Sequence, residues 1–98
     1  MKLQPFFRKA ARLEYEEAAI WYESQKTGLG IEFVEEIERA LFAACEAPQR
    51  CRTALQDVRR IRVNRFPYFI FFRARESQLI VLSVFHVRRN PTVWRERT

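Results

Sequence analysis

The first half of this chain carries apolar residues at the spacing of one helix face. One such stripe lies between Lys9 and about Lys26, and a second lies between about Leu29 and Glu46. Gly28 separates them and suits the left-handed conformation that ends many helices. Because the connection is so short, the two helices are predicted to form an antiparallel hairpin. The first stripe consists of Ala11, Tyr15, Ala18 and Tyr22, and the second of Gly30, Phe33, Val34, Ile37, Leu41, Ala44 and Cys45.

The second half is rich in Val, Ile, Phe and Tyr, which predicts β-strands. The three runs are Val58–Val63, Tyr68–Arg75 and Leu79–Val87. The last run is apolar at both parities, which is typical of an internal strand that is buried on both faces. At the other end of the chain, Lys2–Phe7 is predicted to be an edge strand, because Pro5 cannot donate a ladder hydrogen bond.

Two further segments complete the predicted fold. Pro48–Gln56 is polar and irregular and is interpreted as a loop. Asn90 and Pro91 suit the start of a short helix over Thr92–Arg97. The element order is then β-α-α-β-β-β with a short C-terminal helix. This order predicts an α+β fold, in which the helical hairpin packs on one face of a small, mainly antiparallel sheet.

The composition is that of one packed domain spanning residues 1–98, since 48% of the residues are hydrophobic. No stretch approaches the roughly 18–20 apolar residues of a membrane span, and the N-terminal residues lack a signal-peptide pattern. With only Cys45 and Cys51, a reducing cytoplasm is the expected location. One His and two Cys are too few ligands for a structural zinc site, so no metal or cofactor is expected.

Charge is divided unevenly between the two halves. Residues 1–50 hold 7 Lys and Arg against 9 Asp and Glu, whereas residues 51–98 hold 11 Arg and no Lys against 3 acids. A net charge of −2 therefore precedes one of +8. The basic half predicts a polyanion or an acidic protein as partner, with an ordinary basic surface as the alternative.

The arginines of Val58–Val63 and its neighbours have three interpretations. They can deter edge-to-edge pairing of strands, neutralise phosphates, or pair with acidic side chains of another protein. Strand alternation places Arg60 and Arg62 on one face with Val58, and Arg59 on the other with Ile61 and Val63. Arg60 and Arg62 are expected to be the exposed pair, with the other face beside the helices or in a groove. The candidates for binding a target or its phosphates are Arg59, Arg60, Arg62, Arg65, Arg73, Arg88 and Arg89.

Other conspicuous residues are more typical of packing than of a site. The aromatic run Tyr68–Phe72 is apolar at both parities, so it is predicted to lie in the core rather than to stack on bases. Trp21 and Tyr22 are likewise predicted to pack between helix and sheet. Glu14, in the first turns of its helix, suits the helix dipole.

Several of these sequence phrases together resemble the RelE/ParE superfamily of bacterial toxins, and the ParE branch more than the RelE branch. The phrases are AAIWY (residues 18–22), GLGIEF (28–33), DVRRIRVNRF with PY (57–68), and FHVRRNP (85–91) with Trp94 and Arg97. The resemblance covers nearly the whole chain. It implies the toxin half of a type II toxin–antitoxin pair that acts in the cytoplasm and is neutralised by a cognate antitoxin. ParE toxins inhibit DNA gyrase without known enzymatic chemistry, whereas RelE toxins cleave mRNA on the ribosome.

The residues themselves favour the first of these mechanisms. Cleavage of RNA needs a proton acceptor and a proton donor, and arginine supplies neither, because its pKa stays above about 12. Residues 27–98 contain no lysine, which leaves His86 as the one group of the predicted sheet that titrates near neutrality. A nuclease would use His86 as acid and base, with Arg59, Arg73 and Arg88 around the phosphate. The alternative for His86 is a hydrogen bond to nearby backbone at a strand end.

The expected partners follow from this interpretation. An antitoxin is expected to contribute an amphipathic helix to an apolar groove and acidic residues to the arginines. Leu13 and Ile20, on the side of the first helix away from its stripe, are candidates for that groove, together with Trp94. The expected target is gyrase or, alternatively, the ribosome with its mRNA, and no membrane partner is expected. A non-toxic basic binding module of the same fold is the remaining alternative.

Overall fold

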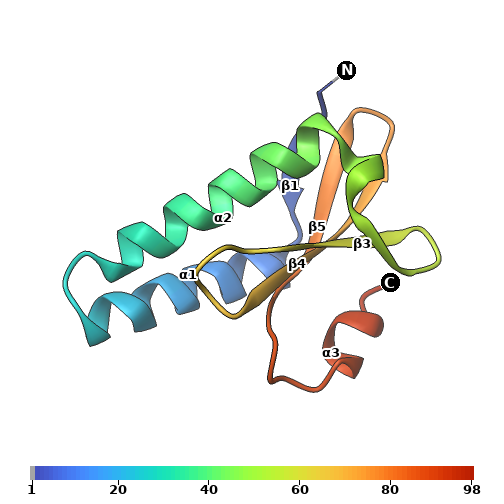
Figure 1. Cartoon of the computed structure of the whole chain (residues 1–98). Helices are drawn as coiled ribbons and strands as arrows, with labels where there is room; N and C mark the ends of the chain where they lie inside the picture. The colour runs from blue at the N-terminus through green and yellow to red at the C-terminus, as the bar shows by residue number, and fades with distance from the viewer. Residues whose placement is uncertain (1) are drawn as a thin grey trace.

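A computed structural model describes residues 2–98 and confirms the predicted α+β fold (Figure 1). The elements in chain order are β1 (Gln4–Phe7), α1 (Lys9–Gln25), α2 (Leu29–Glu46), the single 3-10 turn Pro48–Arg50, β2 (Arg52–Leu55), β3 (Val58–Arg62), β4 (Tyr68–Arg75), β5 (Gln78–His86) and α3 (Thr92–Arg95). The short helix α3 begins where predicted, and the side-chain oxygen of Asn90 accepts a hydrogen bond from the backbone N–H of Thr92 at 3.0 Å.

The five strands form one sheet in the order β1-β5-β4-β3-β2. β1 lies at one edge and pairs in parallel with β5, and all other pairs are antiparallel. β5 is internal, as its apolar character at both parities predicts. A two-residue turn, Glu76 and Ser77, joins β4 to β5, because Arg75 pairs with Gln78.

β2 is the one strand that the sequence pattern did not indicate. It lies in the segment interpreted as a loop, and it pairs with β3 so that Arg52 stands opposite Arg60 and Thr53 opposite Arg59. The pattern of β2 is weak because three of its four residues are exposed, and the ladder is irregular between Thr53 and Leu55. β2 covers only part of β3, so the sheet ends in a short, uneven edge.

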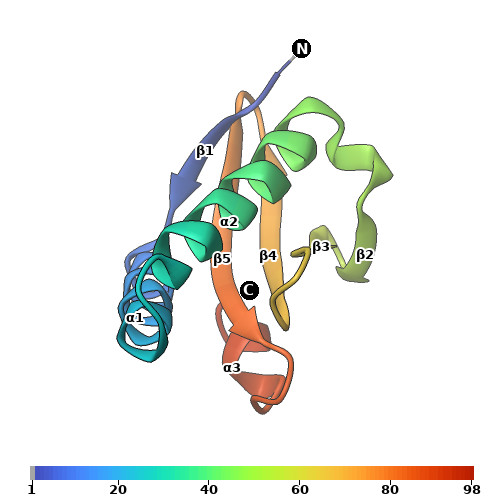
Figure 2. The same cartoon turned by 60° about the vertical axis from the view of Figure 1, so that its left-hand side comes forward.

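Hydrophobic side chains fill both faces of the sheet. The larger cluster lies between the sheet and the α1–α2 hairpin and includes Phe33, Ile37 and Phe72, all fully buried. The smaller cluster lies on the opposite face, where α3 packs. Figure 2 shows α3 beside the C-terminal end of β5, apart from α1 and α2. The smaller cluster comprises Val58, Phe71, Leu82, Phe85 and Trp94.

The turn between α1 and α2 depends on two glycines and one glutamate. Gly28 has a φ of 90°, the left-handed conformation that the sequence predicts for it. At Gly30 a Cβ atom would lie 2.6 Å from the backbone oxygen of Ala19, so only glycine allows the helices to approach this closely. The Glu23 carboxylate accepts hydrogen bonds from the N–H groups of Gly28 and Gly30 at 2.9 and 3.0 Å, which satisfies two of the donors at the start of α2.

No helix within residues 2–98 is both long and apolar enough to cross a membrane.

Candidate interaction surfaces

Several of the candidate arginines bind carboxylates of the protein itself. Arg65 pairs with Glu32 and Glu36 of α2. Arg73 and its neighbour Arg75 share Asp57, at 2.9 and 3.1 Å. These contacts leave Arg65 and Arg73 less free for a target than their place in the sequence suggests.

Arg89 is engaged in the same way, by Glu14 of α1. One oxygen of this largely buried carboxylate accepts from Arg89 at 2.6 Å, and the other accepts from Arg97 at 2.9 Å. The second oxygen also accepts from the Ser83 hydroxyl and from the N–H of Val84, both at 3.0 Å. Burial alone would raise the pKa of Glu14, but the hydrogen bonds from Arg97, Arg89 and Ser83 outweigh it and hold that pKa below its ordinary value. Glu14 therefore fastens the C-terminal segment to α1 and β5.

The strand alternation predicted for β3 is confirmed. Arg59 lies on the helix side of the sheet, where its guanidinium donates to the Cys51 carbonyl at 2.7 Å. Arg60 and Arg62 lie on the other face, opposite Phe71 and Phe69 respectively. Of the predicted arginines, Arg60 and Arg62 thus form the pair that is open to a partner, while Arg59 has an internal role.

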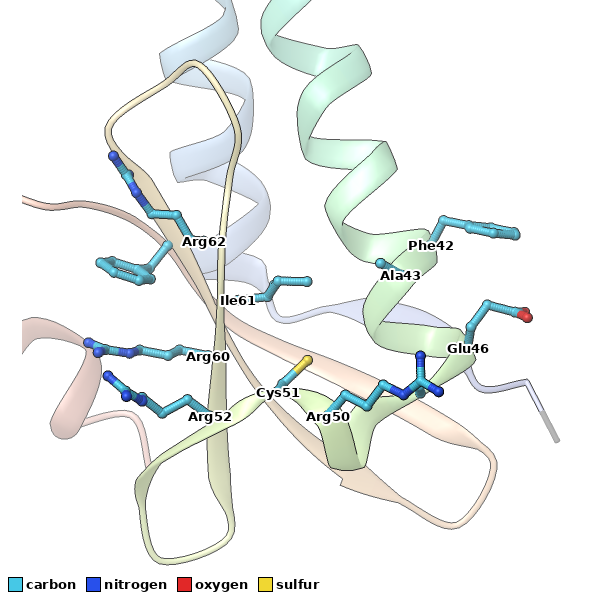
Figure 3. A pocket seen from close by; sticks show the side chains of 11 residues that line it. Phe42, Ala43, Glu46, Arg50, Cys51, Arg52, Arg60, Ile61 and Arg62 are labelled. Atoms are coloured by element: carbon cyan, nitrogen blue, oxygen red, sulfur yellow. The ribbon is translucent and has the colours of Figure 1, made fainter.

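A cleft of about 750 Å³ opens at the β2–β3 edge of the sheet, beside the C-terminal end of α2 (Figure 3). Arg52, Arg60 and Arg62 extend from its strand side in the same direction, away from α2, whereas Arg50, Glu46 and Phe42 lie on the helix side. Arg50 and Arg52 were not among the predicted residues. The sequence pattern predicts a loop over Pro48–Gln56, and a loop does not fix where its arginines lie relative to Arg60.

His86 lies near Arg88 in the chain but far from Arg73, the arginine of β4 in the hypothetical nuclease site. Tyr68 stands opposite His86, whereas Arg73 stands opposite Ile80, so His86 and Arg73 lie on the order of 15–20 Å apart along the strands. The His86 ring contacts Tyr68 edge-on, with ring centroids 5.1 Å apart, and its Nδ1 accepts a hydrogen bond from the Arg88 N–H at 3.1 Å. This is the backbone hydrogen bond at a strand end that the sequence offers as the alternative for His86.

The tyrosines do not supply the missing proton-transfer groups. Burial, with smaller effects from Glu38 and Tyr22, raises the pKa of Tyr15 and of Tyr68 to about 12. Burial also raises the pKa of Tyr22, against a hydrogen bond from Tyr68 that lowers it. A phenol with so high a pKa is a poor general base near neutral pH. Burial likewise raises the pKa of the free thiols of Cys45 and Cys51.

The outer face of the helical hairpin is apolar and exposed. Leu13 and Ile20 are 54% and 70% exposed, as expected for residues opposite the buried stripe. Ile20 faces Ile31 of α2 across a shallow groove of about 370 Å³ whose lining is almost wholly apolar. Trp21 is also exposed, at 57%, so the prediction that Trp21 and Tyr22 pack between helix and sheet is wrong for Trp21 and right for Tyr22.

Trp94 lies away from this surface and is only 5% exposed. Its indole stacks on Phe71 with ring centroids 4.0 Å apart, which fastens α3 to the sheet. Trp94 therefore offers little surface to a partner while α3 is in place.

Within residues 2–98, no group of three or more His, Cys, Asp and Glu side chains is arranged to hold a metal ion.

The comparisons with known proteins agree with the fold. The family described as "ParE toxin of type II toxin-antitoxin system, parDE" matches residues 6–91. Among solved structures, a chain of a "Chromosomal ParDE TA system from P. aeruginosa" is similar with a TM-score of 0.73 at 14% sequence identity. The match covers 89% of this chain and 98% of that one. No curated protein sequence matches.

Proposed function

Because this chain belongs to the family of ParE toxins of type II toxin–antitoxin systems, we propose that it arrests growth in the cytoplasm by inhibiting DNA gyrase. The observation that supports inhibition over RNA cleavage is the separation of His86 from Arg73 along the sheet. A ribonuclease must hold a proton acceptor, a proton donor and cations around one phosphate. Here the His86 Nδ1 is occupied by a backbone N–H, Arg73 is bound to Asp57, and the buried tyrosines have raised pKa values.

We further propose that a cognate antitoxin covers the exposed face of the helical hairpin. Leu13, Ile20, Trp21 and Ile31 are each more than half exposed, although monomeric proteins rarely leave large apolar patches uncovered. An amphipathic helix laid along the groove between α1 and α2 would bury Ile20 and Ile31, which line it.

A growth assay followed by two biochemical assays tests the proposed toxicity. Induced expression without any antitoxin is expected to stop growth, and unimpaired growth would refute the toxin function. The purified protein is expected to inhibit plasmid supercoiling by gyrase, while primer extension on translated messages shows no new cleavage sites.

The variant His86→Ala separates the two mechanisms. Because His86 has no part in the proposed inhibition, this variant is expected to keep its toxicity and its effect on gyrase. Loss of toxicity in a variant with an unchanged thermal unfolding midpoint, together with mRNA cleavage by the original protein, would establish the RelE-like mechanism instead.

A further inference from the structure

The arginines of the basic half divide into those that the fold neutralises and those that it does not. Arg65, Arg73, Arg75, Arg89 and Arg97 all have carboxylate partners within the protein. Arg52, Arg60 and Arg62, here called the arginine row, form no ion pair with any carboxylate of residues 2–98. Arg59, Arg88 and Arg95 also lack an ion pair within these residues, but Arg59 donates to the Cys51 carbonyl on the helix side, and Arg88 and Arg95 lie after β5. The row is therefore the one group of three unpaired arginines on a single face of the sheet within residues 2–98.

The sheet register brings the three guanidiniums to one face. Arg52 of β2 stands directly opposite Arg60 of β3, and Arg62 follows two residues later on the same face. Like charges directly opposite each other destabilise a pair of strands. Thr or Gln at these two positions would avoid this repulsion. A bound polyanion would offset it by neutralising the arginines.

The row is also held in position before any partner arrives. The guanidiniums of Arg60 and Arg62 lie 4.5 and 5.5 Å from the centre of the Phe69 ring, at cation–π distances. Arg62 additionally donates to the carbonyls of Phe66 and Tyr68, at 3.1 and 3.2 Å. Positioned side chains lose less conformational entropy on binding, and each guanidinium keeps free N–H donors for oxygen atoms of a ligand.

We propose that the arginine row binds the phosphodiester backbone of duplex DNA, so that the toxin engages gyrase while gyrase holds its DNA; the biological setting rests on the proposed function. Binding to phosphates is driven by charge and needs no apolar anchor. A protein partner is held mainly by buried aromatic and apolar anchors, and here Phe69 is occupied by guanidiniums while Trp94 is buried. Phe42, the strongly exposed apolar residue of the cleft, lies across from the row on the helix side (Figure 3).

Direct titration of the purified protein tests the site without gyrase. Fluorescence anisotropy with a labelled duplex of about 20 base pairs is expected to show affinity falling about 40-fold between about 50 and 200 mM salt, as release of counterions from three phosphates predicts. The triple variant Arg52→Gln/Arg60→Gln/Arg62→Gln is expected to lose at least about tenfold in affinity at the lower salt and most of the salt dependence. The corresponding triple Lys variant, which keeps the charge, is expected to retain both.

A matched control removes the same charge elsewhere. Arg8, Lys9 and Lys26, at the two ends of α1, are exposed and form no ion pair with any described residue. The triple Gln variant of these residues is expected to bind DNA within about twofold of the original protein. An equal loss in both Gln variants would mean that overall basicity, and not the row, binds DNA, and would overturn the proposal.

Competitors distinguish the other polyanions. A polyglutamate peptide that displaces the duplex at equal concentration of charge would assign the row to an acidic protein, and an RNA duplex that binds tenfold more tightly would assign it to RNA; either result overturns the proposal. Failure of the site and failure of the proposed function are separable. DNA binding that depends on the row without inhibition of gyrase refutes only the function, and inhibition by the triple Gln variant at full strength refutes only the site.

Discussion

Glu14 is the residue on which distant parts of the chain converge. Its carboxylate joins α1 to Ser83 and Val84 of β5, to Arg89 after that strand, and to Arg97 after α3. The sequence predicts only that a glutamate in the first turns suits the helix dipole. The actual partners lie 69 to 83 residues further along the chain, and a local pattern carries no information about contacts of that range.

Replacing Glu14 with Gln is expected to lower the free energy of unfolding at neutral pH by about 2–3 kcal/mol, since charge-assisted hydrogen bonds become weaker ones. The folded-state pKa of Glu14 lies below its ordinary value of 4.5, so its contribution is complete above that pH and is lost as the pH falls through the folded-state pKa. The difference between the two proteins should therefore shrink below about pH 4. Urea unfolding from pH 3 to 7 measures it.

Glu16→Gln serves as the control for this experiment, because Glu16 is exposed on the same helix and forms no ion pair with any residue of 2–98. It is expected to change stability by less than about 0.5 kcal/mol at every pH. A Glu14→Gln difference that does not vary with pH would show that the carboxylate charge has no role in holding the C-terminal segment.

At the scale of elements, the helices and the long strands follow from local periodicity, and β2 does not. An apolar periodicity can be recognised only over several helical turns or strand residues, and β2 has just four residues, whose apolar and polar positions do not alternate. It is a strand because β3 provides an edge to pair with. The cleft beside the arginine row was unpredicted for the same reason, since Arg52 reaches Arg60 only through that pairing.

The hairpin offers a test at this scale. Glu23→Ala removes the carboxylate that caps the first N–H groups of α2, and it is expected to destabilise the protein by about 1–2 kcal/mol, the range of helix-capping residues. Thermal and urea unfolding measure the effect, and Glu16→Ala on the exposed side of α1 is the matched control. Equal stability of the two variants would show that water satisfies the start of α2 as well as Glu23 does.

At the scale of the whole molecule, the acidic and basic halves of the sequence are brought together and partly cancel. Glu14, Glu32 and Glu36 come from the acidic half, and Arg65, Arg89 and Arg97 come from the basic half. Composition predicts a basic surface, and strand alternation predicts that Arg60 and Arg62 share a face. Which arginines stay uncompensated depends on helix–sheet packing, which the sequence pattern leaves open.

The proposed antitoxin surface is also a property of the whole molecule, since it is the large apolar face that the fold leaves uncovered. Ile20→Asp is expected to weaken binding of a cognate antitoxin at least tenfold, because a carboxylate would have to lose its water where the Ile20 side chain becomes buried in the complex. Isothermal titration calorimetry measures the affinity. Ile20 is 70% exposed, so the fold should keep its stability.

Two controls accompany this variant. Ile20→Leu keeps an apolar side chain in the groove and is expected to bind normally, and Val87→Asp places the same charge on an exposed apolar position after β5. Unchanged affinity of Ile20→Asp would remove the α1–α2 groove from the interface.

The parallel pairing of β1 with β5 has a consequence for how the protein is made. Residues Gln4–Phe7 are synthesised well before their strand partners, Gln78–Val81, and chains grow at about 5–20 residues per second. The first strand must therefore wait roughly 4–15 seconds before its partner exists. During that interval the hairpin of α1 and α2 is complete in sequence but has no sheet to cover, so its apolar stripe is open to any helix already present. An antitoxin made beforehand would meet the nascent toxin before the toxin has finished folding.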